Sequence, residues 1–322
     1  MDLLPFLAPI TADLARVDAT IRDRLGSDVA LVRQVADYIV AGGGKRLRPA
    51  MVLLSAGASG YRGEGHYELA AVVEFIHTAT LLHDDVVDGS GLRRGRNTAN
   101  IEFGNAAAVL VGDFVYSRAF QMMLSVNSMR VMRVLADATN TIAAGEVLQL
   151  MNCHDPAVDE ARYLEVVRRK TAKLFEAAAR LGAVLADASP AVEAGLAEYG
   201  GRLGTAFQLI DDVLDYSSDA ATIGKSLGDD LAEGKPTLPL ICAMGRGSAA
   251  QAELVRRAII DGGREAFAPV LEVVRATGAL DYARGVAERE AQAARAALAP
   301  LAASKYKDSL LELASFSVTR RS

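Results

Sequence analysis

Two groups of three aspartates have the spacing of a metal-binding helix face. Both follow the pattern DDxxD, and their members are Asp84, Asp85, Asp88, Asp211, Asp212 and Asp215. Residues three and four apart share one face of a helix, so each group crowds like charges within about one turn. Crowded carboxylates beside apolar residues are costly without a cation, and Mg²⁺ commonly joins carboxylates to phosphate oxygens. The pattern therefore predicts Mg²⁺ that joins these carboxylates to phosphate oxygens.

A longer sequence echo surrounds the two groups. Residues 78–88 and 205–215 share Thr, Ala, Leu, Asp, Asp, Val and Asp in the same order and spacing. Either two similar helices face each other across one site, or similar helical environments selected similar residues twice. A single DDxxD motif is explained equally well by a solvent-exposed acidic helix face and by a metal-binding site. Two copies at the ends of apolar helices, where the helix dipole disfavours anions, favour a functional pair.

Cations and possible phosphate donors adjoin both groups. A glycine turn at 42–44 precedes Lys45 and Arg48 and resembles an anion-binding element, although it lacks the GxxxxGK[ST] pattern of a nucleotide P-loop. His77 lies nearly two helical turns before Asp84 on the same face and could donate to a phosphate, while a satisfied core histidine is the ordinary alternative. The remaining candidates near the two groups are Arg93, Arg94, Lys170, Thr171, Lys225 and Lys235. Together with a metal, such groups stabilise a departing diphosphate.

The elements that must position these residues are helices. Apolar residues recur at intervals of three and four, alanine and leucine are abundant, and strictly alternating β-branched runs are scarce. The prediction is an all-α protein with polar loops at 89–97 and 219–235, the second a mobile lid. Without a Ser- or Pro-rich linker, residues 1–322 are expected to form a single domain. The expected helices are 7–24, 28–41, 46–59, 65–88, 105–127, 129–152, 158–185, 189–217, 235–246, 248–261, 264–277, 279–299 and 304–316.

Composition narrows the classes of function. Hydrophobic residues make up 51% and charged residues 23% of 322 positions, enough apolar material for a large core. A net charge of −5 gives no general attraction for nucleic acid. The N-terminus lacks the basic region of a signal peptide, and no apolar stretch is long enough to span a bilayer. Two cysteines far apart suggest neither a disulfide framework nor a zinc site, so the expected location is the cytoplasm.

These motifs, in this order, resemble the trans-isoprenyl diphosphate synthase, or polyprenyl synthetase, family. The resemblance spans about residues 40–240 and is carried by GGGKRLRP, EFIHTATLLHDDVVD, LRRG, GNAAAVLVGDF, KTAKLF, GTAFQLIDDVLD and GKSLGDDLAEGKPTLP. It implies an isoprenoid-synthase bundle of roughly ten or more helices around a central cavity. It also implies a homodimer, although no interface can be read from the sequence.

The resemblance assigns roles to the candidates. The six aspartates would hold about three Mg²⁺ ions on the allylic diphosphate. Arg93 would contact that diphosphate, and Lys45, Arg48, His77 and Arg94 would bind isopentenyl diphosphate. The allylic side would be completed, and the departing pyrophosphate stabilised, by Lys170, Thr171, Gln208, Lys225 and Lys235.

The implied reaction is ionisation of an allylic diphosphate such as farnesyl diphosphate, attack by the isopentenyl double bond, and loss of a proton. Synthases that stop early often carry bulky aromatics four and five residues before the first aspartate, where this chain has Thr80 and Ala79. A helical wheel places Ala79 nearly opposite the aspartates, so its role in lining a tunnel rests on the resemblance alone. Met123 and Leu135 are candidates for the tunnel floor.

The segments GNAAAVLVGDFVYSRAFQMM and AAGEVLQLMN resemble long-chain members that make octaprenyl, solanesyl or decaprenyl diphosphate for quinone side chains, and octaprenyl or decaprenyl is expected here. Three alternatives stay open. The first is a shorter-chain synthase that makes geranylgeranyl or farnesyl diphosphate. The second is a noncatalytic partner subunit, which degraded aspartate motifs would mark. The third is a class I terpene cyclase, which fits poorly because cyclases usually lack a second DDxxD.

Overall fold

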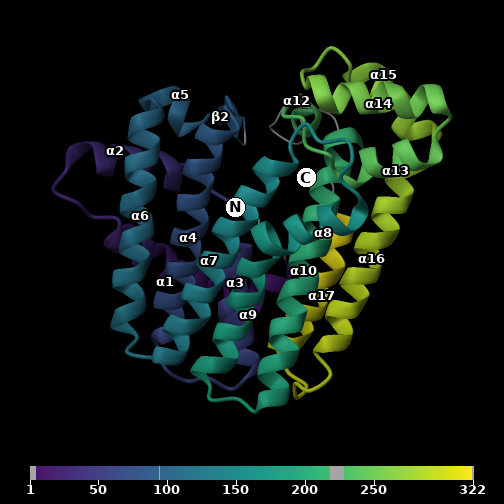
Figure 1. Cartoon of the computed structure of the whole chain (residues 1–322). Coiled ribbons are helices and arrows are strands. Elements are labelled where there is room, and N and C mark those ends of the chain that lie inside the picture. Colours follow the sequence, from purple (N-terminus) through teal and green to yellow (C-terminus); the bar gives the residue numbers. More distant parts are fainter. Residues whose placement is uncertain (1–4, 94, 218–227, 321–322) are drawn as a thin grey trace. The chain divides into compact units, whose positions relative to one another are not determined.

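The computed structural model describes residues 5–93, 95–217 and 228–320, and these fold almost entirely into helices (Figure 1). The prediction of an all-α protein is confirmed. By their internal contacts the residues form two compact units. Unit 1 consists of residues 1–139, 174–200 and 295–313, and unit 2 of residues 140–173, 201–294 and 314–322. The expectation of a single domain stays a prediction.

Unit 1 is built around one long apolar helix. Its elements in chain order are η1 (Pro5–Ile10), α1 (Thr11–Arg24), α2 (Ala30–Ala41), α3 (Leu47–Ala58), α4 (Gly65–Val87), β1 (Leu92–Arg93), β2 (Arg96–Asn97), α5 (Ala99–Phe103), α6 (Asn105–Ser125), the first half of α7 (Met129–Asn152), α9 (Lys173–Leu185), the start of α10 (Pro190–Ser217) and much of α17 (Lys305–Thr319). Helix α4 packs against α6, α3 and α1. Every residue at 69–76 is buried, so this part of α4 is enclosed on all sides by neighbouring residues.

Unit 2 holds the remaining helices around two apolar clusters. Its further elements are α8 (Glu160–Val167), the π-helix η2 (Arg168–Ala172), α12 (Asp229–Ala232), α13 (Leu238–Arg246), α14 (Ala249–Asp261), α15 (Phe267–Ala276) and most of α16 (Ala279–Ala297). One cluster includes Leu240, Val255 and Val270 of α13 to α15. The other joins Tyr163 of α8 to Ile210 of α10 and therefore supports the second aspartate group.

The expected helices lie close to the observed ones, with three kinds of difference. The helix expected at 158–185 is interrupted by η2, where hydrogen bonds from i to i+5 widen the turn. The short helices α5 and α12 and the two-residue ladder between β1 and β2 were not expected. Most of the expected lid at 219–235 lies outside the described residues, and its described end contains α12.

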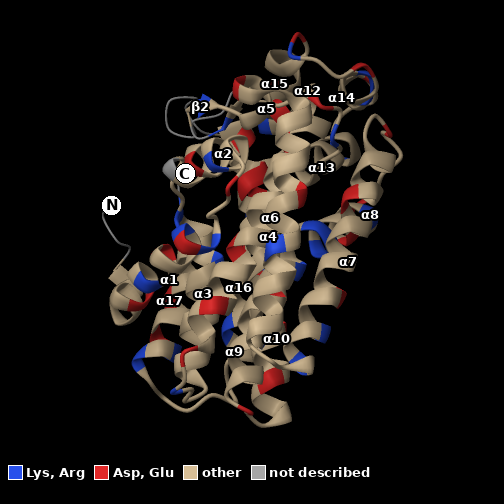
Figure 2. Ribbon diagram, turned by 90° about the vertical axis from the view of Figure 1, so that its left-hand side faces the viewer, with Lys and Arg blue, Asp and Glu red and all other residues tan. Residues whose placement is uncertain are grey.

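Positive and negative side chains are mixed along the helices (Figure 2), in agreement with the small net charge of −5. Figure 2 shows Lys and Arg interspersed with Asp and Glu along the helices, with long uncharged stretches between them. None of the helices in the described part of the chain has both the length and the apolar character of a bilayer span.

Close helix packing in unit 1 depends on a glycine of α9. A Cβ built on Gly182 would lie 2.4 Å from the backbone nitrogen of Ala56 and 2.5 Å from the carbonyl carbon of Ser55, both in α3. Real Cβ atoms do not approach backbone this closely, so any larger residue must push α3 and α9 apart.

We expect Gly182→Val to lower the free energy of unfolding by about 3 kcal/mol or more, because overpacking against backbone exceeds the small gain in helix propensity. Urea unfolding followed by circular dichroism measures the loss. Gly245→Val is the control, since Gly245 is exposed and a Cβ there meets nothing within 4 Å. Equal stability of the two variants would contradict the close contact.

Candidate active site

The first aspartate group ends helix α4, as expected. Asp84 and Asp85 lie in its last turn, and Asp88 follows directly after its final residue. Asp85 is only 4% exposed, whereas Asp84 and Asp88 are half-buried. The C-terminal end of a helix carries partial negative charge, so carboxylates here need compensating donors or cations.

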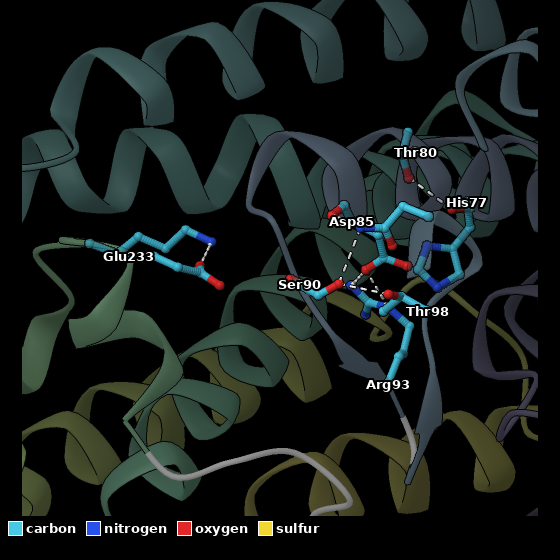
Figure 3. A network of polar contacts seen from close by, with 9 residues as sticks. His77, Thr80, Asp85, Ser90, Arg93, Thr98 and Glu233 are labelled. Carbon is cyan, nitrogen blue, oxygen red and sulfur yellow. Dashed lines mark hydrogen bonds and ion pairs between the residues drawn. The ribbon is translucent and has the colours of Figure 1, made fainter. Parts of the chain in front are cut away.

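Arg93 supplies that compensation to Asp85. Its Nε and Nη2 atoms donate to Asp85 Oδ1 at 2.9 and 2.6 Å, and Figure 3 shows the guanidinium turned back toward the carboxylate. Arg93 lies in β1, where it pairs with Arg96 of β2. The role predicted for Arg93 was contact with an allylic diphosphate, and the structure places it beside the first aspartate group. Arg94 lies outside the described residues.

The loop that carries Arg93 is tied to the end of α4 by polar contacts. Thr98 Oγ1 donates to the Ser90 carbonyl at 2.6 Å, and Asn100 Nδ2 donates to the carbonyls of Asp85 and Ser90 at 3.1 and 3.3 Å. Figure 3 shows this network around Asp85. A buried amide that bridges two backbone carbonyls fixes the loop relative to the helix. Thr98 and Asn100 thus hold Arg93 in place, and sequence reasoning missed both.

The glycine-rich turn presents its cations in different directions. Lys45 is exposed, and Arg48 Nη1 lies 3.1 Å from His77 Nε2. The Arg48 guanidinium also stacks over Phe175 of α9, 4.5 Å from the ring centroid. The structure therefore brings together two residues that the resemblance assigned to isopentenyl diphosphate.

Arg46, between these cations, turns into the unit instead. It has a left-handed backbone with φ 49° and forms ion pairs with Asp18 at 3.1 Å and Glu74 at 2.5 Å. A non-glycine residue in this conformation is held by its surroundings, here by two carboxylates. Arg46 therefore anchors the turn from which Lys45 and Arg48 project.

The residues predicted to set product length are mostly in the core of unit 1. Ala79, Met123 and Leu135 are fully buried, and half-buried Thr80 donates its hydroxyl to the His77 carbonyl at 2.8 Å. A pocket beside α4 is lined in part by Ile39, Phe75, His77, Thr78, Leu81 and Val115. None of the four candidates lines this pocket as far as the chain is described, so their role in a tunnel stays a prediction.

The second aspartate group occupies the last two turns of α10. Asp212, 3% exposed, accepts hydrogen bonds from Tyr163 Oη at 2.5 Å and Gln208 Nε2 at 2.7 Å. Gln208 Oε1 in turn accepts from Thr171 Oγ1 at 3.0 Å. The structure thus joins Thr171 and Gln208, both predicted site residues, to Asp212. Tyr163 was missed, because nothing in its local sequence marks it.

The other two members of this group have different partners. Asp215 accepts backbone hydrogen bonds from Gly228 at 3.1 Å and from Asp230 at 3.4 Å. Asp211 Oδ1 accepts from Arg320 Nη2 at 2.7 Å. Arg320 was not predicted, since its position near the end of the numbered chain gives no sign of a contact 109 residues away.

Burial dominates the electrostatics of Asp212. It raises the pKa of this carboxyl well above its ordinary value, and the nearby negative charge of Asp230 adds to the increase. The hydrogen bonds from Tyr163 and Gln208 oppose the shift without cancelling it. Burial likewise raises the pKa of Tyr163 well above its usual range. Asp212 is therefore a carboxylate whose ionised form is disfavoured without a bound cation.

The π-helix η2 carries Lys170 and Thr171. Lys170 Nζ lies 2.5 Å from Glu146 Oε2 of α7, and a Cβ on Gly145 would lie 2.7 Å from the Lys170 backbone nitrogen. Such π-helical turns occur frequently at functional sites because they re-aim side chains. Lys235 forms an ion pair with Glu233, which is labelled in Figure 3. Lys225 lies outside the described residues.

The donor set fits Mg²⁺ when the ion is shared with a diphosphate. In residues 5–93, 95–217 and 228–320, no three carboxylate, imidazole or thiolate groups lie close enough to enclose an ion. Mg²⁺ rarely needs such a cage, because it usually keeps waters and phosphate oxygens beside one or two carboxylates. Both groups offer hard carboxylate oxygens of this kind. Each group lies in its own unit, and their convergence on one site stays a prediction.

Comparison with known proteins defines the class. The family model named Polyprenyl synthetase matches residues 29–274. The octaprenyl diphosphate synthase of Escherichia coli K12 is 55% identical over 309 residues, which is 96% of each chain. An all-trans-nonaprenyl-diphosphate synthase (geranyl-diphosphate specific) of Rhodobacter capsulatus is 46% identical over 315 residues, covering 98% of this chain and 97% of the other.

A solved structure supports the same family. The polyprenyl synthase of Caulobacter crescentus CB15, complexed with calcium and isoprenyl diphosphate, superposes with a TM-score of 0.96 at 47% identity, covering 98% of this chain and 97% of the other. This chain therefore belongs to the polyprenyl synthetase family. It is accordingly a prenyltransferase, as the sequence predicted.

The pKa of Asp212 predicts a pH dependence of stability. A carboxyl whose pKa is raised on folding stabilises the protein fully below the unfolded pKa of about 3.9 and loses that stabilisation as pH rises toward the folded pKa. We therefore expect the free energy of unfolding of metal-free protein to fall as pH rises above this value.

Asp212→Asn cannot ionise and should show a smaller fall as pH rises above about 3.9, measured by urea unfolding with a chelator present. Asp281→Asn, at an exposed position of α16, should behave like the wild type. Parallel pH profiles for the wild type and Asp212→Asn would refute the prediction.

Proposed function

We propose that the chain is a long-chain trans-polyprenyl diphosphate synthase that makes octaprenyl diphosphate from isopentenyl diphosphate and an allylic primer such as farnesyl diphosphate. The observation that carries this is 55% identity with an octaprenyl diphosphate synthase over 96% of both chains, with both aspartate groups intact. Between the octaprenyl and decaprenyl products expected from the sequence, this relative favours octaprenyl. Such a product would serve quinone side-chain synthesis.

The residues divide into two substrate sites in this proposal. The six aspartates hold Mg²⁺ on the allylic diphosphate, assisted by Arg93, Lys170, Thr171, Gln208, Lys225 and Lys235. Isopentenyl diphosphate is bound by Lys45, Arg48, His77 and Arg94. The contact between Arg48 and His77 supports a common anion site, and the Thr171, Gln208 and Asp212 network supports the allylic one. The solved relative with calcium and isoprenyl diphosphate supports a metal and diphosphate site.

The proposed reaction requires no protein nucleophile. It requires that the protein position the two diphosphate substrates relative to each other. When bound, Mg²⁺ neutralises negative charge on the diphosphate as the carbon–oxygen bond breaks. The cationic side chains orient both diphosphates so that the isopentenyl double bond meets the allylic carbon. Apolar walls keep water from trapping the cation as an alcohol. The proton lost at the end passes to the released pyrophosphate.

The proposal also includes the domain organisation, the oligomeric state and the cellular location of the protein. The family match at 29–274 includes residues of both units and supports a single polyprenyl synthetase domain for residues 1–322. An exposed apolar side of α6, with Leu110 and Leu124, supports a homodimer. The two free thiols, Cys153 and Cys242, fit a reducing cytoplasm.

The direct test is to incubate the purified chain with Mg²⁺, farnesyl diphosphate and labelled isopentenyl diphosphate and to identify the product by mass. Octaprenyl diphosphate is expected. Asp84→Ala should lower turnover roughly 10²-fold, because the loss of a metal ligand misplaces Mg²⁺ and leaves phosphate charge uncompensated. Asp281→Ala, an exposed aspartate outside both groups, should retain wild-type turnover.

The other outcomes separate the alternatives. A geranylgeranyl product would indicate a shorter-chain synthase, a cyclic hydrocarbon would indicate a cyclase, and no product would indicate a noncatalytic subunit. Near-wild-type turnover of Asp84→Ala would remove the first aspartate group from the site.

Product length gives a second prediction. Ala79→Tyr places a bulky ring in a fully buried position before the first aspartate group and should shorten the product. Thr80→Tyr, at a half-buried position, provides a second variant with less risk to folding. Chromatography of the dephosphorylated products measures chain length. Ala15→Tyr, on the exposed side of α1, is the control and should leave the length unchanged. Unchanged length in both test variants would exclude these residues from the tunnel.

A further inference from the structure

Arg320 is a buried cation that contacts the second aspartate group. Its side chain is 4% exposed, whereas that of Asp211 is 44% exposed. Nη2 donates to Asp211 Oδ1 at 2.7 Å and to the Phe207 carbonyl at 2.8 Å, and the guanidinium carbon lies 3.7 Å from the centroid of the Phe207 ring. Arg320 follows directly after α17, so this contact joins the end of α17 to α10 within unit 2.

This arrangement holds the guanidinium in one place. A buried arginine is costly unless a carboxylate and further acceptors replace its water. Asp211 supplies the opposite charge, and Phe207 supplies both a carbonyl and a ring face. Arg320 Nε is buried with no hydrogen-bond partner in the described part of the chain, so the position is maintained by the contacts of Nη2 and the ring.

The charge of Arg320 distinguishes Asp211 from Asp212, which follows it directly in the sequence. Asp212 accepts hydrogen bonds from the neutral donors Tyr163 and Gln208, and Asp215 accepts from backbone N–H groups. Neutral donors orient a carboxylate without removing its attraction for a metal ion. A guanidinium instead neutralises the carboxylate and repels a divalent ion beside it.

We propose that Arg320 is a counter-cation for Asp211, which stabilises the metal-free second aspartate group and weakens its binding of metal alone. The inference rests on the proposed function, in which Asp211 binds Mg²⁺ together with a diphosphate. A diphosphate brings negative charge that the same guanidinium attracts. Arg320 therefore acts as a positioning residue that favours the metal–diphosphate complex over the bare ion.

The test measures metal binding without turnover. Mn²⁺ is titrated into the metal-free, substrate-free protein and followed by electron paramagnetic resonance. Arg320→Gln should bind Mn²⁺ roughly threefold or more tightly than the wild type, because one repelling charge is removed at a partly screened site. With inorganic pyrophosphate present the order should reverse. The melting temperature of the metal-free variant should fall, because Asp211 loses its partner.

Two further variants keep the result interpretable. Arg289→Gln removes the same charge from an exposed position on α16 of unit 2 and should match the wild type in both titrations. Arg320→Met fills the space over Phe207 without charge, and should reproduce the result if the Gln variant does not fold. Failure of both Arg320 variants to fold would make Arg320 a structural residue and overturn the proposal.

The remaining outcomes separate this inference from the function. Equal Mn²⁺ affinity of the wild type and the Arg320 variants, with and without pyrophosphate, would overturn the counter-cation role and leave the synthase assignment intact. A wild type that binds no Mn²⁺ even with pyrophosphate would instead defeat the metal role of the aspartate groups, and with it the proposed function.

Discussion

Crowded carboxylates at the ends of apolar helices are the constraint on which the rest of the structure depends. Asp85 and Asp212 are almost fully buried, where an ionised carboxyl is unfavourable unless donors or cations replace its water. The protein meets this constraint differently in the two groups. Arg93 compensates Asp85 from a short ladder directly after α4, whereas Tyr163 and Gln208 compensate Asp212 from α8 and α10.

This difference limits the meaning of the sequence echo between the two groups. Asp85 and Asp212 occupy equivalent places in the two DDxxD patterns, yet one has a charged partner and the other has neutral ones. In the second group Asp211, the residue before Asp212, pairs with Arg320. The repeated sequence pattern therefore predicts that each aspartate group lies at the end of a helix. It does not predict which residues pair with the aspartates.

The sequence predicted the helices well because their signals are local. Apolar periodicity located α4, expected at 65–88, and α10, expected at 189–217. The π-helix was not predicted, because its five residues are too few to show a period of their own. The described end of the expected lid became α12, whose four residues are too few to show a period.

For the site, residues within one motif could be found, and their distant partners could not. Arg48 with His77, and Thr171 with Gln208, were candidates that the structure brings into contact. Arg46 lies between two of the candidates in the sequence, whereas its side chain forms ion pairs with Asp18 and Glu74. Tyr163 and Arg320 reach the aspartates only through the fold, so no spacing rule could reveal them.

The approach of Gly145 to the backbone of Lys170 has a consequence for how mutations in this enzyme are interpreted. Gly145 has no functional group, yet it sets the distance between α7 and the π-helical turn that aims Lys170 and Thr171. A substitution there would displace two candidate site residues although Gly145 itself is not one of them. Sequence variation in this family at a position without a side chain can therefore act as strongly as variation at a charged residue.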